Sequence, residues 1–257
     1  MATDIDVAAA MRQVGVSPTE WVMLHGDAGV AAQLRSIEAA QRLPHLLQQL
    51  LDFISFGTLL VPAFSYSFTK GEDFDAAHTP GNVGQLSEVF RSLPGVQRTR
   101  HPIFSVAAIG AGTPEVMNAR LDDCFGPGTV FDLLNQHDAK IVCLGCDFSR
   151  ITFVHYVEQR YGVAYRYSKP FSGQLIDDGQ ATPLTTQYLV RDLAIQSSCD
   201  LRWLKAEAIR RGVLKMGELG RFPVTAISAR QFLSLAFELL KQDEHALIEQ
   251  GAASHAV

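Results

Sequence analysis

Residues 21–29 read WVMLHGDAG, and together with residues 57–62, which read GTLLVP, they decide the fold. Both contain a short apolar run typical of a buried strand. The residues between them, from Ala31 to Ile54, have the pattern of a helix interrupted near Pro44, where a proline disfavours a continuous helix. A strand, a crossover helix and a second strand predict parallel pairing of the two strands. The chain therefore begins as an α/β protein.

The remaining segments extend this pattern. Strands are predicted at residues 104–109 and 140–144, and helices at residues 4–15, 84–91, 114–121, 130–136, 201–211 and 228–241. Residues 165–187 alternate and turn at the sequence DDG, residues 177–179, which favours a hairpin. We predict a single α/β domain over residues 1–257, with a mixed, largely parallel central sheet, helices on both faces and a hairpin-containing insertion near 165–190. The C-terminal residues 246–257 are predicted to fray.

The composition limits the classes of function. The chain has 257 residues, of which 47% are hydrophobic, enough to bury the core of one large domain. A formal charge of −5 and scattered basic residues argue against nucleic acid as a partner. The N-terminus lacks the basic start and apolar run of a signal peptide, and no stretch reaches the roughly twenty apolar residues of a membrane span. We expect a cytoplasmic protein with no membrane partner.

The cysteines favour a reduced compartment. They are Cys124, Cys143, Cys146 and Cys199. Cys143 and Cys146 have the spacing of half a zinc site, but no second pair with that spacing exists. Cys143 lies in the apolar run IVCL, residues 141–144, and is predicted to be a buried strand cysteine. We therefore predict no metal site from the cysteines.

The clearest candidate for chemistry is ITFVHYVE, residues 151–158. If this stretch is helical, His155 and Glu158 are three residues apart and lie on one face. An imidazole beside a carboxylate is a good proton acceptor, because the carboxylate favours the protonated ring. The alternative interpretation is a capped or solvated helix face.

Two further segments are candidates for binding an anion. The glycine-bearing loop 26–29 lies between a strand and a helix, where backbone N–H groups attract phosphate or carboxylate, although a simple turn has the same pattern. In QRTRHP, residues 97–102, the side chains of Arg98, Thr99 and His101 are suited to an anionic tail. The alternative is an ordinary charged connection.

Two other features are candidates for ligand binding or catalysis. Asp75 and Glu88 flank the turn that ends the long aromatic loop 65–81, and carboxylates near aromatic rings suit a cationic or polyhydroxyl ligand. Helix capping or surface charge is the alternative interpretation. Cys146 precedes His155 by nine residues in the sequence and is a candidate thiol nucleophile.

Several short motifs occur in a specific order. They are Gly57-Thr58-Leu59 with Pro62; Thr79-Pro80 with Gly84, Leu86, Glu88, Phe90 and Arg91; Arg98-Thr99 and His101-Pro102 with Ser105 and Ala107-Ala108; Phe125-Gly126-Pro127; Thr152, His155 and Glu158; and Gly217-Glu218-Leu219-Gly220. This set resembles the signature of the aminoglycoside 3-N-acetyltransferase family. The resemblance covers about residues 18–240, and the joint presence and order of the motifs make it specific.

The resemblance implies an acetyl-CoA-dependent N-acetyltransferase with the family's own α/β fold, in which the acceptor amine attacks the thioester directly. His155 matches the family's general base. Glu207 matches the acidic residue that orients this histidine, and Glu158 is the rival for that role. The residues implied in CoA binding are Asp27, Ala28, Gly29, Val30, Arg98, Thr99, His101, Phe104, Ser105 and Thr152. The acceptor is expected beside Tyr66, Asp75 and Glu88.

Two features depart from the family pattern. Family members commonly read HSSLS after the first strand, whereas this chain reads HGDAG at residues 25–29 and lacks those hydroxyls. Residues 71–81 hold only the carboxylates of Glu72, Asp73 and Asp75, which are few for an antibiotic with several ammonium groups. We therefore expect a different amine as the acceptor, such as an amino sugar made for a surface polysaccharide or another glycoside.

Other readings stay open at this point. The chain can be a catalytically inactive acyl-CoA-binding protein. It can also be a hydrolase that uses the Cys146 thiol or a metal held by His155 and Glu158. In any of these cases we expect a monomer or a homodimer.

Overall fold

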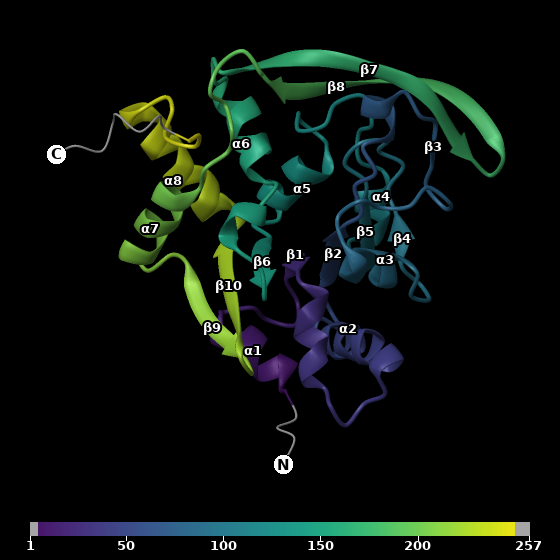
Figure 1. The fold of residues 1–257 in the computed structure, drawn as a ribbon, viewed down its shortest axis with the longest axis vertical. Coiled ribbons are helices and arrows are strands. Elements are labelled where there is room, and N and C mark those ends of the chain that lie inside the picture. The colour runs from purple at the N-terminus through teal and green to yellow at the C-terminus, as the bar shows by residue number, and fades with distance from the viewer. Residues whose placement is uncertain (1–4, 250–257) are drawn as a thin grey trace.

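The computed structural model describes residues 5–249. Its centre is a seven-stranded sheet with the strand order β4-β5-β2-β1-β6-β10-β9 (Figure 1). The bounds of these strands are β1 (Trp21–Gly26), β2 (Thr58–Pro62), β4 (Gln97–Arg98), β5 (Val106–Gly110), β6 (Lys140–Leu144), β9 (Lys215–Leu219) and β10 (Phe222–Ser228). A second, three-stranded sheet contains β3 (Phe74–Asp75), β7 (Arg166–Asp177) and β8 (Gln180–Arg191).

Only the middle of the large sheet is parallel. β1 pairs in parallel with β2 on one side and with β6 on the other, so that Met23 lies opposite both Leu60 and Ile141. The outer pairs, β2–β5, β5–β4, β6–β10 and β10–β9, are antiparallel. The mixed α/β class and the parallel crossover are confirmed, whereas the expectation of a largely parallel sheet is wrong. No strands were predicted at β9 and β10. These two strands form an antiparallel pair at one edge of the sheet, so this edge lacks the parallel pairing that was expected.

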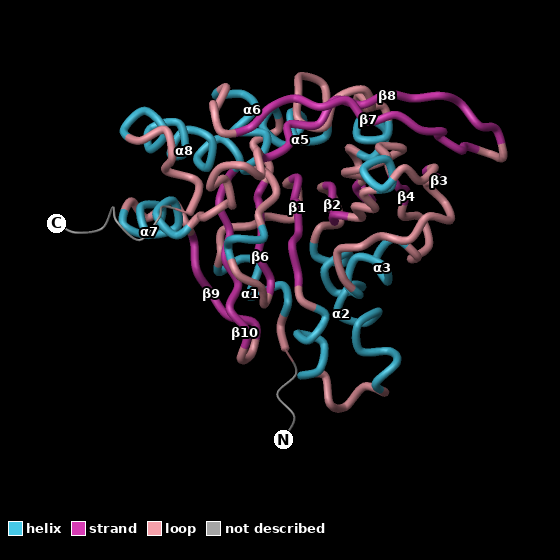
Figure 2. The backbone as a smooth tube through the Cα atoms, turned by 45° about the horizontal axis from the view of Figure 1, so that its top comes forward, coloured by secondary structure: helices cyan, strands magenta, loops and turns pink. Residues whose placement is uncertain are grey.

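Helices cover both faces of the sheet, as predicted (Figure 2). The core on one face includes α1 (Val7–Gln13), α2 (Arg42–Phe53) and α3 (Gln85–Arg91). The core on the other face includes α4 (Thr113–Met117), α5 (Val130–Gln136), α6 (Val154–Tyr161), α7 (Arg202–Arg210) and α8 (Ala229–Gln242). Because successive side chains of a strand point to opposite faces, Met23 of β1 joins the second core while Val22 and Leu24 join the first.

The crossover between β1 and β2 differs from the predicted helix in its first half. Short 3-10 helices at Ala28–Gln33 and Ala39–Gln41 precede α2. The prediction of a helix from Ala31 to Ile54, interrupted near Pro44, is therefore wrong for residues 31–41 and holds for α2. Pro44 lies in the first turn of α2, where its missing N–H leaves no hydrogen bond unmade. The proline thus marks the start of the helix.

The hairpin β7–β8 confirms the predicted turn. Its strands pair from Arg166 opposite Arg191 to Asp177 opposite Gln180. Asp178 and Gly179 have φ angles of 47° and 77°, which are the left-handed conformations of a type I′ turn. In Figure 1 the hairpin arches across the molecule from above α6 towards β3, which pairs with β7. This course brings hairpin side chains next to α6.

The two ends of the chain fall partly outside the described residues. The start of the first predicted helix, at residue 4, and residues 250–257 of the predicted frayed end lie outside them. Residues 246–249 are packed, with Leu247 and Ile248 buried and Ile248 bridged to Cys199, so fraying does not begin where it was expected. Within residues 5–249, none of the helices has the length and apolar character needed to cross a bilayer.

Candidate active site

The first turns of α6 present His155 next to a buried carboxylate. His155 Nδ1 lies 2.7 Å from Glu158 Oε2, and the two side chains are 20% and 0% exposed. Burial by itself raises the pKa of Glu158, but the hydrogen bond to His155 and the charges of His155 and Arg166 lower it below its ordinary value. An ionised Glu158 can only accept, so Nδ1 carries a proton and Nε2 is the ring nitrogen left for proton transfer. The predicted pairing of these residues is confirmed.

Two further side chains hold Glu158 in place. Arg166, at the start of β7, has its Nε 2.7 Å from Glu158 Oε2, out of line for a hydrogen bond but close enough for an ion pair. The Tyr165 hydroxyl donates to Glu158 Oε1 at 3.1 Å. Burial raises the pKa of Tyr165 and keeps this hydroxyl protonated. Glu158 is therefore fixed on both carboxylate oxygens, and it fixes the imidazole in turn.

A cavity of about 580 Å³ lies where β1, β2 and β6 end. We call it the β1 cavity. In open α/β sheets ligands bind at the carboxyl ends of the strands. Its lining includes His25, Gly26, Asp27, Ala28, Tyr66, Asn82, Gln85, Ser87, Cys146, Ser149, Arg150 and Thr152.

A second cavity, of about 470 Å³, lies between α6 and the hairpin, and we call it the hairpin cavity. His155 lines it, together with Arg166, Tyr167, Lys169, Phe171, Tyr188, Val190, Arg191, Leu193 and Cys199. The two cavities are neighbours, because Thr152 lines the β1 cavity and its carbonyl accepts a hydrogen bond from the His155 N–H at 3.0 Å.

An aromatic cluster also connects the two cavities. Phe104 contacts Tyr66 of the β1 cavity and Tyr188 of the hairpin cavity, with ring centroids 5.6 and 5.1 Å apart. Phe125 lies against both His155 and Tyr188, at 5.6 and 6.1 Å. His155 therefore stands at the boundary between the two spaces.

The loop after β1 reaches the β1 cavity only in part. Asp27 and Ala28 line the cavity. The Asp27 carboxylate accepts a hydrogen bond from Gly29 N at 2.7 Å and caps the following 3-10 helix. Val30 is fully buried in the core behind the loop. The predicted binding loop is thus at the cavity, but its acidic side chain is used in its own turn.

Arg98 is a structural residue in the described chain. Its guanidinium donates to the carbonyls of Ala63, Ala76 and Thr79 and to the Ser105 hydroxyl. Burial lowers the pKa of Arg98 to about 10, so it stays charged at neutral pH. Neither Arg98 nor Ser105 lines the β1 cavity. These contacts give no support to the expectation that the pair contacts CoA, because their polar atoms hold the β2 end and the loop before α3.

His101, Thr99 and Phe104 are likewise internal. His101 Nδ1 accepts from the N–H groups of Ile103 and Phe104, which leaves Nε2 to donate to the Asp123 carbonyl at 3.1 Å. Burial lowers the pKa of His101 to about 4. The Thr99 hydroxyl accepts from Val106 N at 2.9 Å. These contacts shape the turn that precedes β5 and give no support to the expectation that this segment holds CoA phosphates.

Of the residues expected beside the acceptor, Tyr66 lines a cavity and the two carboxylates do not. Tyr66 lies at the β1 cavity with a φ of 58°. The Asp75 carboxylate accepts from the N–H groups of Ala77 and His78 and pairs with the His78 ring. Glu88 pairs with Arg91 and accepts from Gly81 N. The capping interpretation therefore fits Asp75 and Glu88, and these contacts give no support to the expectation that they bind the acceptor.

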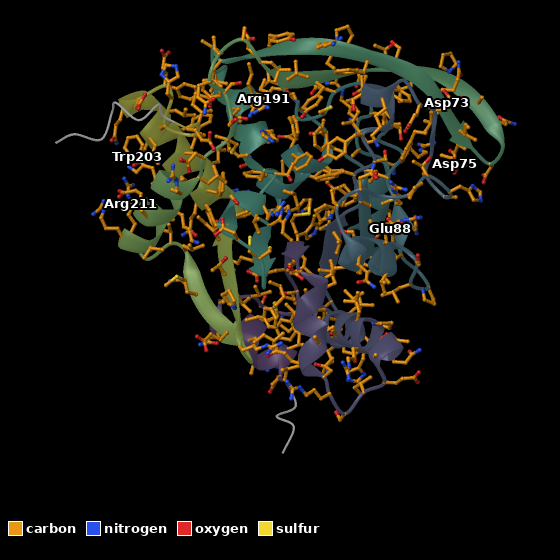
Figure 3. All side chains as sticks on the ribbon, viewed as in Figure 1. Asp73, Asp75, Glu88, Arg191, Trp203 and Arg211 are labelled. Atoms are coloured by element: carbon orange, nitrogen blue, oxygen red, sulfur yellow. The ribbon has the colours of Figure 1, made fainter. Side chains whose placement is uncertain are left out.

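Glu207 does not reach His155. Its carboxylate is bound by Arg210 and Arg211 on α7, at 2.5 and 2.6 Å, and hydrogen bonds from these two guanidinium groups lower its pKa to about 2. Figure 3 shows Arg211 on the outer side of α7. The residue against His155 is Glu158, which decides between the two candidates.

This placement gives a direct prediction for Glu207. We expect Glu207→Ala to leave kcat/KM within about twofold of the parent value, because the residue touches neither cavity. Steady-state thiol release at saturating acetyl-CoA measures the effect. A loss of a hundredfold or more, on the scale expected for the general base and its partner, would restore Glu207 as the residue that orients His155.

A second prediction concerns the internal role of Arg98. We expect Arg98→Ala to lower the free energy of unfolding by about 3 kcal/mol, because it leaves buried carbonyls without donors. The affinity for CoA should stay unchanged. Urea denaturation and CoA titration measure the two quantities. Arg100→Ala is the matched control, since Arg100 forms an exposed pair with Asp177, worth about 0–1 kcal/mol. A stable Arg98→Ala variant with weakened CoA binding would reverse this assignment.

Polar residues at the β1 cavity outside the predicted set are His25, Asn82, Gln85, Ser87, Ser149 and Arg150. Arg150 ends a 3-10 helix, Phe148–Arg150, between β6 and α6. A signal for it was present in the sequence, because a cation placed after a buried strand and before a helix lies at the carboxyl end of the sheet. Asn82 and Gln85 carry no such signal, since only the folded loop before α3 brings them there.

His25 and Cys146 line the β1 cavity. Burial lowers the pKa of His25 to about 4, and its Nε2 has no hydrogen-bond partner within residues 5–249. The Cys146 thiol donates to the His25 carbonyl at 3.4 Å, not to a side-chain base. In the described part of the chain, no group of three His, Cys, Asp or Glu side chains is arranged to hold a metal. These contacts give no support to the hydrolase alternatives.

Known proteins resemble this chain both in fold and in sequence. The fold matches solved aminoglycoside acetyltransferases. For AAC(3)-Xa the TM-score is 0.79 at 21% identity, covering 94% of this chain and 92% of that one. For AAC-IIIb in a binary complex with CoASH it is 0.77 at 18% identity, covering 91% and 94%.

Sequence similarity identifies the family. Residues 30–241 match the aminoglycoside 3-N-acetyltransferase family. Aminoglycoside N(3)-acetyltransferase IV of Salmonella sp is 27% identical over 191 residues, which cover 73% of this chain and 69% of the relative. The chain belongs to the aminoglycoside 3-N-acetyltransferase family and is an N-acetyltransferase. The resemblance drawn from the ordered motifs is confirmed.

Proposed function

We propose that this protein transfers the acetyl group of acetyl-CoA to the amine of an amino sugar or aminoglycoside, with His155 as the general base. The observation that carries the proposal is the Nδ1 contact of His155 with the buried, ionised Glu158, which leaves Nε2 free to accept a proton. Membership in a family named for this transfer supports the reaction type. The CoASH complex of the structural neighbour AAC-IIIb supports the donor.

The two cavities suit the two substrates. The β1 cavity extends along the strand ends to Thr152, which suits the pantetheine arm of acetyl-CoA. Arg150 adds a cation at this cavity for phosphate. The hairpin cavity lies on the other side of the Thr152–His155 hydrogen bond and is assigned to the acceptor. This arrangement brings the thioester and the amine together beside one imidazole.

The chemistry follows from the state of the amine. An amine that is mostly ammonium at neutral pH cannot attack until it loses a proton. In the proposed step His155 Nε2 takes one proton from the bound ammonium, and the neutral nitrogen then attacks the thioester carbonyl carbon. The C–S bond breaks, the departing thiolate takes up the proton from the imidazolium, and the second proton leaves the new amide nitrogen to solvent. Glu158 stabilises the imidazolium that forms between these events.

Thiol release tests the proposed function against the inactive alternative. Purified protein is given acetyl-CoA and, separately, a panel of amines that includes amino sugars and kanamycin, and free CoA is measured with a thiol reagent. We expect amine-dependent release, with the N-acetyl product seen by mass spectrometry. Binding of acetyl-CoA without release in the presence of any amine would support the catalytically inactive acyl-CoA-binding protein.

A further inference from the structure

The hairpin cavity is lined by cationic side chains, which is unusual for a site that would bind an aminoglycoside with several ammonium groups. Of the ten described residues that line it, Arg166, Lys169 and Arg191 are cationic and none is an aspartate or glutamate. Arg166 is compensated by Glu158, with which it forms the buried ion pair. The two remaining cations, Lys169 and Arg191, set the charge of the cavity.

Lys169 and Arg191 have neutral partners. Lys169 Nζ lies 5.1 Å from the centroid of the Phe171 ring. Arg191 Nη1 donates to the Ser198 hydroxyl at 2.7 Å. Neither cation lies within 4.0 Å of a carboxylate in residues 5–249. The hairpin cavity therefore presents uncompensated positive charge next to His155.

The carboxylates that would suit a polycation lie elsewhere. Figure 3 places Arg191 above α6, whereas Asp73 and Asp75 lie at the far part of the hairpin and Glu88 lies below it. Asp73 accepts from Gln174 N, Asp75 pairs with His78, and Glu88 pairs with Arg91. An acceptor with several ammonium groups would meet two cations at His155 and no carboxylate in the lining, which is unfavourable.

Aromatic rings give the same cavity an apolar wall. Tyr167, Phe171 and Tyr188 line it, and Tyr167 is 51% exposed. Ring faces of this kind pack against the flat apolar faces of small ligands, while the cations provide the directional contacts. The cavity volume of about 470 Å³ is within the range of small-molecule sites.

We propose that the acceptor is an amine that also carries an anionic group, a phosphate or a carboxylate, and that Lys169 and Arg191 bind this group while His155 takes the proton of the amine. The inference rests on the proposed function, which it narrows to anionic amino sugars. A charge-assisted hydrogen bond from arginine or lysine is the strong form of this contact. The placement beside His155 makes the anion a determinant of specificity.

The test compares acceptors that differ in charge. Glucosamine, glucosamine 6-phosphate, muramic acid and kanamycin are assayed by thiol release at one ionic strength. We expect kcat/KM for at least one anionic amine to exceed that for glucosamine by about tenfold or more, which corresponds to one charge-assisted contact. Glucosamine 6-phosphate tests a phosphate as the bound anionic group, and muramic acid tests a carboxylate. A preference for kanamycin or glucosamine over both anionic amines would overturn the inference but leave the acetyltransferase in place.

Charge reversal tests the named residues. Lys169→Glu with Arg191→Glu should abolish the preference for the anionic amine. The matched control is Lys215→Glu with Arg221→Glu, on β9 and in the β9–β10 turn. This control changes the net charge of the protein by the same amount and should retain the preference for the anionic amine. Affinity for CoA is measured in both. If the first double variant loses CoA binding, the cations serve the CoA phosphates and the inference fails.

A binding measurement separates the proposal of an anionic acceptor from the proposal of acetyl transfer. Calorimetry measures the same amines with CoA-loaded protein, independently of turnover. Tighter binding of an anionic amine that is lost in Lys169→Glu with Arg191→Glu supports the inference even if no amine is acetylated, in which case the proposed function alone fails. No binding and no turnover of either anionic amine would overturn the inference.

Discussion

Replacement of His155 by alanine should reduce kcat by about a hundredfold or more, because the amine then has no positioned base. The side chain lines the hairpin cavity and is 20% exposed, so its removal leaves the core intact. The affinity for CoA should not change, since His155 does not line the β1 cavity. Single-turnover thiol release and CoA titration separate these two effects.

The pH dependence gives this prediction a second readout. As the pH rises, a growing fraction of the free amine is already deprotonated and needs no base. The deficit of His155→Ala should therefore shrink with increasing pH. His78→Ala is the matched control, because His78 also pairs with a carboxylate three residues away, Asp75, but lies at neither cavity. Unchanged turnover in His155→Ala would reject the general-base role.

Replacement of Glu158 by glutamine should impair both stability and catalysis. Arg166, whose side chain is 4% exposed, would lose its counter-charge, and breaking a buried ion pair in this way costs about 3–5 kcal/mol. An amide in place of the carboxylate no longer fixes the proton on His155 Nδ1, so kcat should fall by about a hundredfold or more. Urea denaturation and steady-state kinetics measure the two losses.

The stability loss should depend on pH with a definite sign. The pKa of Glu158 is lowered in the folded protein, so its contribution is fully present above the unfolded value of about 4.3 and is lost as the pH falls through the folded value. The difference in Tm between the parent and Glu158→Gln should thus be large at neutral pH and shrink in acid. Glu115→Gln is the control, because Glu115 forms an exposed pair with His137. A difference that grows as the pH falls would contradict an ionised Glu158.

The pairing of His155 with Glu158 was accessible from the sequence because its geometry is local. His155 and Glu158 are three residues apart, and helix geometry places such residues side by side wherever the helix packs. The same holds for Asp178-Gly179, whose residue types favour left-handed backbone conformations irrespective of the rest of the fold. The crossover from β1 to β2 was predicted for a related reason, since strand spacing and a connecting helix favour one topology.

The predicted anion-binding segment shows the limit of such local reasoning. Arg98 and His101 have the residue types of a phosphate site, and nothing within the motif distinguishes a ligand from a backbone carbonyl as the acceptor. The carbonyls that Arg98 binds come from residues 63, 76 and 79, which only the folded loop brings together. The expectation that Glu207 orients His155 came from the family resemblance, whereas in the fold its carboxylate pairs with Arg210 and Arg211.

By itself, the sequence determined the α/β class, the parallel strands at the centre, the hairpin turn and the pairing of His155 with Glu158. Each of these depends on spacings of a few residues, which backbone geometry converts directly into contacts. Tertiary structure alone decided that Arg166 compensates Glu158, that Arg98 faces inward, and that the hairpin lays Lys169 and Arg191 beside His155. Those contacts join residues distant along the chain, and their formation depends on how whole elements pack.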